Sequence, residues 1–165
     1  MKSLYVTILL PLLLLFAGCG KDDTLPQPIT GRFDPIFAQV LQERGYIADA
    51  DRIALDEVKE ITDLDLSGRW DPELQKYDGP LTSLRGIEYF ESLKKLNCVG
   101  NRLTSLDISN NTNLRFLLPG NNPGDGTQFF PVTAWFDNDH IPEIFPTGSW
   151  DYNGTTITLD YRKAE

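Results

Sequence analysis

The sequence contains Leu93-Lys-Lys-Leu-Asn-Cys-Val-Gly-Asn101, and the same pattern returns as Leu114-Arg-Phe-Leu-Leu-Pro-Gly-Asn-Asn122. The two copies share leucines at their first and fourth positions and an asparagine at their ninth, and they begin 21 positions apart (114 − 93). Self-similarity at a fixed period of this length is typical of repeat proteins, in which stacked coils share one continuous core. The fold is therefore expected to be a solenoid.

Further copies flank this pair. Leu81-Thr-Ser-Leu84 returns as Leu103-Thr-Ser-Leu106, 22 positions later (103 − 81), and Ile61-Thr-Asp-Leu-Asp-Leu-Ser-Gly68 is an earlier copy of the first pattern. An insertion over residues 69–79 follows that earlier copy, and Arg69 stands where its asparagine would be. We therefore expect the turn of the first coil to be built differently from the later turns.

A short strand followed by a turn explains the pattern. Alternate side chains of the strand point inward, and the asparagine bonds backbone groups that the turn would otherwise leave unpaired. Asn101 and Asn122 occupy this turn position. The residues expected to point inward are Leu96, Cys98, Leu106, Ile108 and Leu117.

These motifs resemble the leucine-rich repeat family, in the short 21-residue form of internalin-like proteins, over residues 61–122. The resemblance implies an α+β fold, a short leucine-rich repeat solenoid with a helical N-terminal cap and a β-rich C-terminal cap. Caps are needed because so few repeats leave apolar ends without a neighbour. The expected boundaries are a signal peptide (1–18), a tether (19–32), the helical cap (33–60), the repeats (61–122) and the β-rich cap (123–165).

The helical cap begins with a clear start signal. Asp34 precedes a proline, and apolar residues follow at helical spacing until Arg44-Gly45, which predicts one helix between these points. A second short helix is predicted over residues 53–60. The segment is similar to helical caps that precede bacterial leucine-rich repeats and carry an EF-hand-like loop.

The residues for metal binding are missing. In the EF-hand-like loop the first, third and fifth positions would be Tyr46, Ala48 and Ala50, which offer no carboxylate for calcium. Zinc requires three or four ligands, and His140 with Cys98 cannot supply them. We therefore expect neither a metal nor a cofactor.

Charge and catalytic motifs exclude further functions. The formal net charge is -9 and no Lys/Arg cluster is present, so binding to nucleic acid is not expected. A hydrolytic triad would depend on His140, which lies in a loop-like stretch, and the chain has no GxSxG motif. The carboxylates of Asp137, Asp139 and Asp151 could serve a glycosidase only in a deep cleft, and they are expected to be solvated. No catalytic residue is assigned.

Aromatic residues are concentrated in the C-terminal segment, residues 128–165. Asn153-Gly154 predicts a two-residue hairpin turn, and residues 133–137 are a further candidate strand. Two roles remain open for the aromatic side chains. They either bury the open end of the last repeat or form an exposed platform for sugar rings or a partner protein. The candidates for the platform are Trp135, Phe136, Trp150 and Tyr152.

The N-terminus predicts export and lipid attachment. Residues 4–17 carry no charge but are too few for a membrane-spanning helix, which is typical of a signal peptide. Leu-Phe-Ala-Gly-Cys at positions 15–19 resembles the lipobox of bacterial lipoproteins, which implies a lipid on Cys19, although Phe16 stands where that family usually has leucine. Lys21-Asp22-Asp23 resembles a surface-export signal, so the expected location is the outer membrane, exposed at the cell surface.

The repeat alignment also predicts a binding surface. It places Asp63, Lys95 and Phe116 in one outward row and Asp65, Asn97 and Leu118 in the next. A polar surface that ends in apolar side chains is typical of a protein contact, although the C-terminal cap could instead cover Phe116 and Leu118.

The function expected from these features is a membrane-anchored protein- or glycan-binding adhesion module that is not an enzyme. The alternatives are a structural or accessory lipoprotein without a ligand of its own and, less favoured, a small carboxylate hydrolase. The residues assigned to the binding surface are Asp63, Asp65, Lys95, Asn97, Phe116, Leu118, Trp135, Trp150 and Tyr152.

Overall fold

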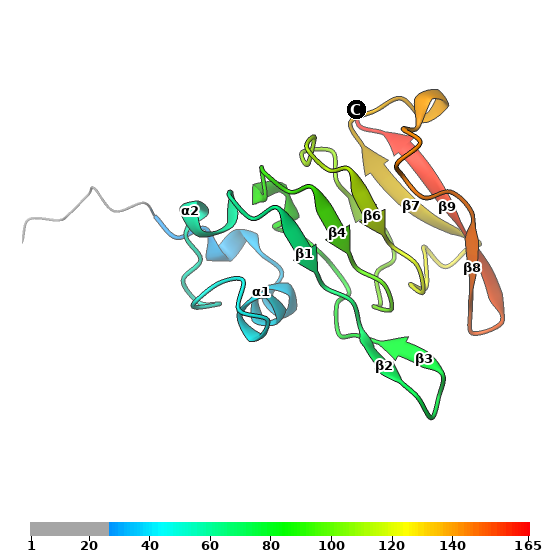
Figure 1. The fold of residues 1–165 in the computed structure, drawn as a ribbon, viewed down its shortest axis with the longest axis horizontal. Helices are drawn as coiled ribbons and strands as arrows, with labels where there is room; N and C mark the ends of the chain where they lie inside the picture. The colour runs from blue at the N-terminus through cyan, green and yellow to red at the C-terminus, as the bar shows by residue number, and fades with distance from the viewer. Residues whose placement is uncertain (1–26) are drawn as a thin grey trace, which may run out of the picture.

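The computed structural model describes residues 27–165. The expected signal peptide (1–18), Cys19 and the first part of the expected tether lie outside the described residues. The described chain has a mixed α+β fold with about three stacked, β-solenoid-like coils. Figure 1 shows the helices at one end of the stack and a sheet of longer strands at the other.

One face of the stack is a parallel sheet in the order β1-β4-β6, to which each coil contributes one strand (Figure 1). The register places Leu64 beside Leu96 and Leu96 beside Leu117. This pairing confirms the predicted repeat alignment, because a slip of one residue would turn every side chain to the opposite face. The strand bounds are Asp63–Asp65 for β1, Lys95–Asn97 for β4 and Phe116–Leu118 for β6.

A second sheet, in the order β5-β7-β9-β8, begins with β5, which lies in the segment that leads from β4 back to β6. Strand β5 pairs in parallel with β7, β7 pairs in parallel with β9, and β8 pairs antiparallel with β9. The C-terminal segment is therefore joined to the coils by main-chain hydrogen bonds. The bounds are Leu106–Asp107 for β5, Phe129–Ala134 for β7, Ser149–Tyr152 for β8 and Thr155–Lys163 for β9.

A single core runs through the stack from the N-terminal helix to the C-terminal sheet. All five residues predicted to point inward are buried, and the 3-10 turn η2 (Ile87–Tyr89) helps to close the end of one coil. Burying one such leucine or isoleucine contributes about 1.5–3 kcal/mol to stability. The largest fully buried side chains include Phe37, Phe90, Phe130, Leu93, Leu96 and Leu103.

The first helix, α1 (Pro35–Glu43), forms as predicted. One carboxylate oxygen of Asp34 accepts hydrogen bonds from the backbone N–H groups of Ile36 and Phe37, at 3.0 and 3.1 Å. These bonds satisfy two of the donors that a helix start leaves unpaired. Gly45, at φ 74°, follows the helix in the left-handed conformation that glycine adopts most readily.

The N-terminal segment differs from expectation in two places. The second helix, α2, covers only Leu55–Val58 instead of residues 53–60. The chain before α1 is not a tether throughout: the 3-10 turn η1 (Thr30–Arg32) is part of the fold, and the N–H of Ile29 donates to the carbonyl oxygen of Ile53 at 2.8 Å. The side chain of Ile29 packs against the core. Its burial attaches this segment to the fold, although the prolines and the glycine of the segment favour an extended tether.

The N-terminal segment also covers the open edge of the β1-β4-β6 sheet. The backbone N–H of Asp65 donates to the hydroxyl of Tyr46 at 2.8 Å. The guanidinium group of Arg44 donates to the carbonyl oxygens of Asp65 and Ser67, each at 2.5 Å. These bonds occupy main-chain groups that an exposed edge would offer to another strand.

The insertion that follows β1 in the first coil is a hairpin of β2 (Arg69–Asp71) and β3 (Lys76–Asp78). It projects from the stack below β1 in Figure 1. The first turn is therefore built differently from the others, as the arginine in place of an asparagine predicted.

The C-terminal hairpin turns at Asn153-Gly154 as predicted, with Tyr152 paired to Thr155. The other predicted strand, residues 133–137, was placed too late, because β7 already ends at Ala134. The chain then turns through η3 (Asn138–His140), where the carboxylate of Asp137 accepts a hydrogen bond from the N–H of Asp139 at 3.1 Å. The carboxylate thus favours the turn over a continued strand.

Candidate functional site

The outward face of the β1-β4-β6 sheet carries the two rows predicted from the repeats. Lys95 is paired with Asp63 on one side and with Phe116 on the other. Asn97 likewise lies between Asp65 and Leu118. The six side chains therefore form one surface, which we call the sheet face.

Phe116 and Leu118 are exposed at the β6 side of the sheet face, with 45% and 37% of their surface accessible. The C-terminal segment does not fold over them, so that alternative is wrong. Both side chains point outward because Leu117 between them is buried in the core. Two neighbouring apolar side chains thus remain in contact with water beside polar ones.

Charged side chains at the β1 side of the sheet face form ion pairs. Lys95 Nζ lies 2.9 Å from Asp63 Oδ1, and this hydrogen bond, together with one from Thr62, lowers the pKa of the Asp63 carboxyl. At Asp65 partial burial raises the pKa, but hydrogen bonds from Ser67 and the charge of Arg44 outweigh it, so that the net shift is downward. Both carboxylates are therefore charged at neutral pH, and each has a nearby cation.

The aromatic candidates of the C-terminal segment do not form an exposed platform. Phe136 is buried, whereas Trp135, Trp150 and Tyr152 are partly buried and pack against the core. Trp150 contacts Phe130 edge to face, with ring centroids 5.7 Å apart, and its Nε1–H donates to the carbonyl oxygen of Asn122 at 2.8 Å. These rings cover the end of the stack, which was the first of the two roles considered.

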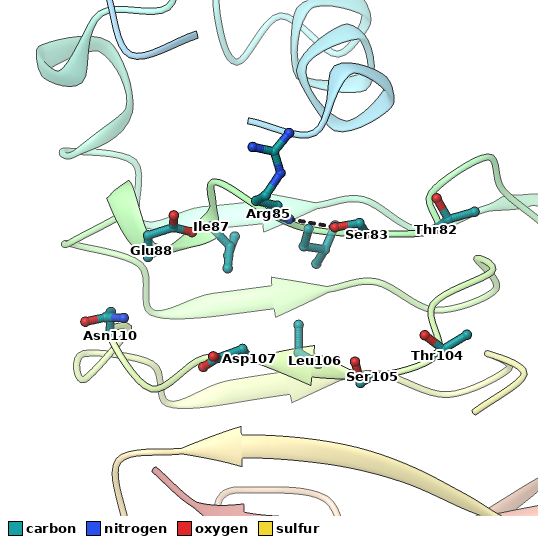
Figure 2. A pocket seen from close by; sticks show the side chains of 11 residues that line it. Thr82, Ser83, Arg85, Ile87, Glu88, Thr104, Ser105, Leu106, Asp107 and Asn110 are labelled. Carbon is teal, nitrogen blue, oxygen red and sulfur yellow. Dashed lines mark hydrogen bonds between the residues drawn. The ribbon is translucent and has the colours of Figure 1, made fainter. Parts of the chain in front are cut away.

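A groove of about 580 Å³ lies between two segments that connect successive strands of the β1-β4-β6 sheet. These segments are residues 82–88, which lead to β4, and residues 104–110, which lead from β4 to β6. Figure 2 shows the two segments side by side, with the side chain of Arg85 pointing away from the groove. That guanidinium group instead donates to the carbonyl oxygens of Gly31 and Phe33, at 3.3 and 2.7 Å. The groove is lined by Thr82, Ser83, Thr104, Ser105, Glu88 and Asp107, among others.

Several polar groups of this groove are used in local turns. Ser83 Oγ accepts from the N–H of Arg85 at 3.1 Å, and Glu88 Oε2 accepts from the N–H of Gly86 at 2.8 Å. Asp107 Oδ1 accepts from both the N–H and the hydroxyl of Ser109. The structure does not bring His140 to these serines, because η3 contributes nothing to the groove lining.

Within residues 27–165, no group of three or more His, Cys, Asp or Glu side chains is placed to hold a metal ion. In the same part of the chain, no helix has both the length and the apolar character needed to cross a membrane.

Three notable residues of the structure were not predicted from the sequence. Trp70 and Tyr77 of the β2–β3 hairpin are exposed, although they are large and apolar. Asn111 is buried and donates from Nδ2 to the carbonyl oxygens of Ile87 and Phe90, at 2.8 and 3.2 Å. Asn111 stands at the ninth position of the copy that begins at Leu103, as Asn101 and Asn122 do in their copies, and this spacing could have indicated it. The contact between the two rings follows only from the register of the hairpin.

No protein-family model matches the chain, and the search of curated proteins returned no match.

Proposed function

We propose that this protein is a leucine-rich repeat lipoprotein of the cell surface that binds a partner protein without catalysing a reaction. The repeat pattern, the buried turn asparagines and the stacked parallel strands support the leucine-rich repeat type. On this proposal the N-terminal helical segment and the C-terminal sheet serve as caps, because each covers an end of the coil stack.

The exposure of Phe116 and Leu118 beside a polar surface is the observation that carries the binding proposal. Apolar side chains at the centre of a contact supply most of its energy, and the polar rim supplies specificity. The partner is expected to be a protein that presents an apolar patch to β6 and polar groups to the paired charges of Asp63 and Lys95. A partner without an apolar patch would leave the two β6 side chains in water.

The proposed surface location depends on Cys19, where a diacyl group and an N-terminal acyl chain would together anchor the protein. Mass spectrometry of the N-terminus of the native protein tests this. A mature chain that begins at Cys19 with three acyl chains is the expected result. An unmodified Cys19 or cleavage at another position would reject the lipoprotein proposal.

Binding is tested by crosslinking the protein on intact cells and identifying what it captures, with the variants Phe116→Ser and Leu118→Ser beside the wild type. The expected result is one protein captured by the wild type and lost in both variants. The matched control is Phe129→Ser, because Phe129 is exposed to a similar degree but lies on β7. Equal capture by all four proteins would exclude the sheet face as the contact.

A further inference from the structure

A second cavity, of about 310 Å³, lies at the edge of the stack between the β2–β3 hairpin and the β8–β9 hairpin. Its lining comes from the two hairpins and from the coil turns at Asn101 and Asn121. The cavity shares no residue with the sheet face or with the groove in Figure 2. It is therefore a separate site, which we call the hairpin pocket.

Two aromatic rings form one wall of the hairpin pocket. Trp70 and Tyr77 are paired across the hairpin, and their ring centroids lie 5.0 Å apart with an interplanar angle of 62°. Trp70 is 48% exposed and Tyr77 is 38% exposed. Tyr152 contributes a third ring from the other hairpin. Exposed rings around a cavity offer flat apolar faces on which a ligand with its own apolar face can stack.

The base of the β2–β3 hairpin packs closely against a coil turn. Gly100 has φ 69°, and a Cβ atom added to it would lie 2.0 Å from Cβ of Tyr77. A Cβ atom on Gly68 would lie 2.1 Å from the carbonyl oxygen of Gly100. The hairpin thus packs directly against the coil turn. A side chain at either glycine would prevent this contact. A pocket whose walls are already in place loses little conformational entropy when it binds a ligand.

The remaining lining groups are mainly hydrogen-bonding side chains. Amide groups are contributed by Gln75, Asn121 and Asn153, which all have positive φ, at 50°, 54° and 52°. Carboxylates are contributed by Asp151 and by Asp78, whose charge is paired with Arg102 at 3.0 Å. An amide both donates and accepts hydrogen bonds and a carboxylate accepts them, so the set is suited to hydroxyl groups.

We propose that the hairpin pocket binds a neutral sugar residue of a glycan. A pyranose ring has an apolar C–H face for stacking on Trp70 or Tyr77 and an edge of hydroxyl groups for the amides and Asp151. The volume lies near the lower end of the roughly 300–1,000 Å³ of small-ligand pockets, which favours one or two sugar rings over a longer segment. The pocket lining carries the cation Lys76 as well as the carboxylates of Asp78 and Asp151, so it has no excess of positive charge for an anionic ligand, and the formal net charge of the chain is -9.

The test is titration calorimetry of the purified protein with neutral tetrasaccharides of glucose, galactose, mannose and N-acetylglucosamine. At least one of them is expected to bind. Trp70→Ala and Trp70→Leu should each weaken that binding by about tenfold or more, since aromatic anchors carry much of the energy of a contact. Trp70→Leu keeps an apolar side chain beside Tyr77, and unchanged melting temperatures verify that both variants are folded.

The matched control is Phe116→Ala, which removes an exposed ring from the sheet face and should change sugar affinity by less than about twofold. The inference is overturned if the wild type binds none of the four sugars at millimolar concentration, or if both Trp70 variants keep wild-type affinity. Loss of sugar binding in Phe116→Ala alone also overturns it. Failure of protein capture at the sheet face with sugar binding intact would contradict only the proposed function.

Discussion

The side chain of Asn122 donates a hydrogen bond from Nδ2 to the backbone carbonyl oxygen of Cys98, 3.0 Å away in the preceding coil. Its Oδ1 accepts from the N–H of Leu103 at 3.0 Å. One coil earlier, Asn101 makes the same inter-coil bond to the carbonyl oxygen of Leu66, at 2.8 Å. Each asparagine also donates to a carbonyl oxygen of its own turn, that of Pro119 for Asn122 and that of Cys98 for Asn101, so it satisfies buried backbone groups of two neighbouring coils.

Replacing Asn122 by leucine should lower the free energy of unfolding by at least about 1–3 kcal/mol, because the buried N–H of Leu103 and the buried carbonyl oxygen of Pro119 lose their hydrogen bonds to the Asn122 amide. Chemical denaturation measures the change. The control is Asn110→Leu, since Asn110 is exposed and should shift stability by less than about 0.5 kcal/mol. Similar losses in the two variants would mean that the side-chain bonds of Asn122 contribute little.

Leu96→Ala should destabilise the protein by about 2–5 kcal/mol, because Leu96 is fully buried between its neighbours on β1 and β6. Lys95→Ala, at the adjacent and exposed position, should change stability by no more than about 0.5 kcal/mol. Thermal and urea unfolding of both variants check this contrast. Equal effects at the two positions would contradict the assigned strand register.

Lys95→Met should raise the pKa of the Asp63 carboxyl, because it removes the hydrogen bond that contributes most to the downward shift. The folded state binds protons at Asp63 less readily than the unfolded state, so this carboxylate stabilises the fold above its ordinary pKa of 3.8. That contribution is lost as the pH falls through the lower, folded pKa. NMR titration of the Asp63 side chain measures both proteins, and identical midpoints would refute the pairing.

The thiol of Cys98 should be unreactive in the folded protein. Burial raises its pKa to about 12, so almost no thiolate is present at pH 8. In a Cys19→Ser variant, a maleimide reagent should label Cys98 only after denaturation. Rapid labelling of the folded variant would show that the coil opens at this strand.

Phe116→Ala and Trp150→Ala should have different effects on stability. Phe116 is exposed, so the loss of its ring should leave the melting temperature nearly unchanged. Trp150→Ala instead removes the ring contact with Phe130 and the hydrogen bond to the carbonyl oxygen of Asn122. A decrease of several degrees is expected for Trp150→Ala, since about 1 kcal/mol corresponds to roughly 2–8 °C in a domain of this size. Differential scanning calorimetry compares the two. A large loss in Phe116→Ala would place that ring in the core.

The spacing of residues along the sequence was sufficient to predict most features of the coils. The leucine periods predicted which residues are buried, and the alignment of Asp63 with Lys95 and Phe116 predicted the rows of the sheet face, because stacked identical coils bring equivalent positions together. The start of α1 at Asp34 and the turn at Asn153-Gly154 were also predictable, since both depend on neighbouring residues alone.

The sequence by itself thus determined the repeat, its inward leucines and its outward rows. Only the tertiary structure decided that Ile29 belongs to the fold, that Trp150 covers the end of the stack, and that Trp70 and Tyr77 meet Tyr152 at one pocket. These outcomes depend on contacts between segments far apart in the chain. Local periodicity specifies which way a side chain points from its own strand, but not which distant segment lies there to bury it.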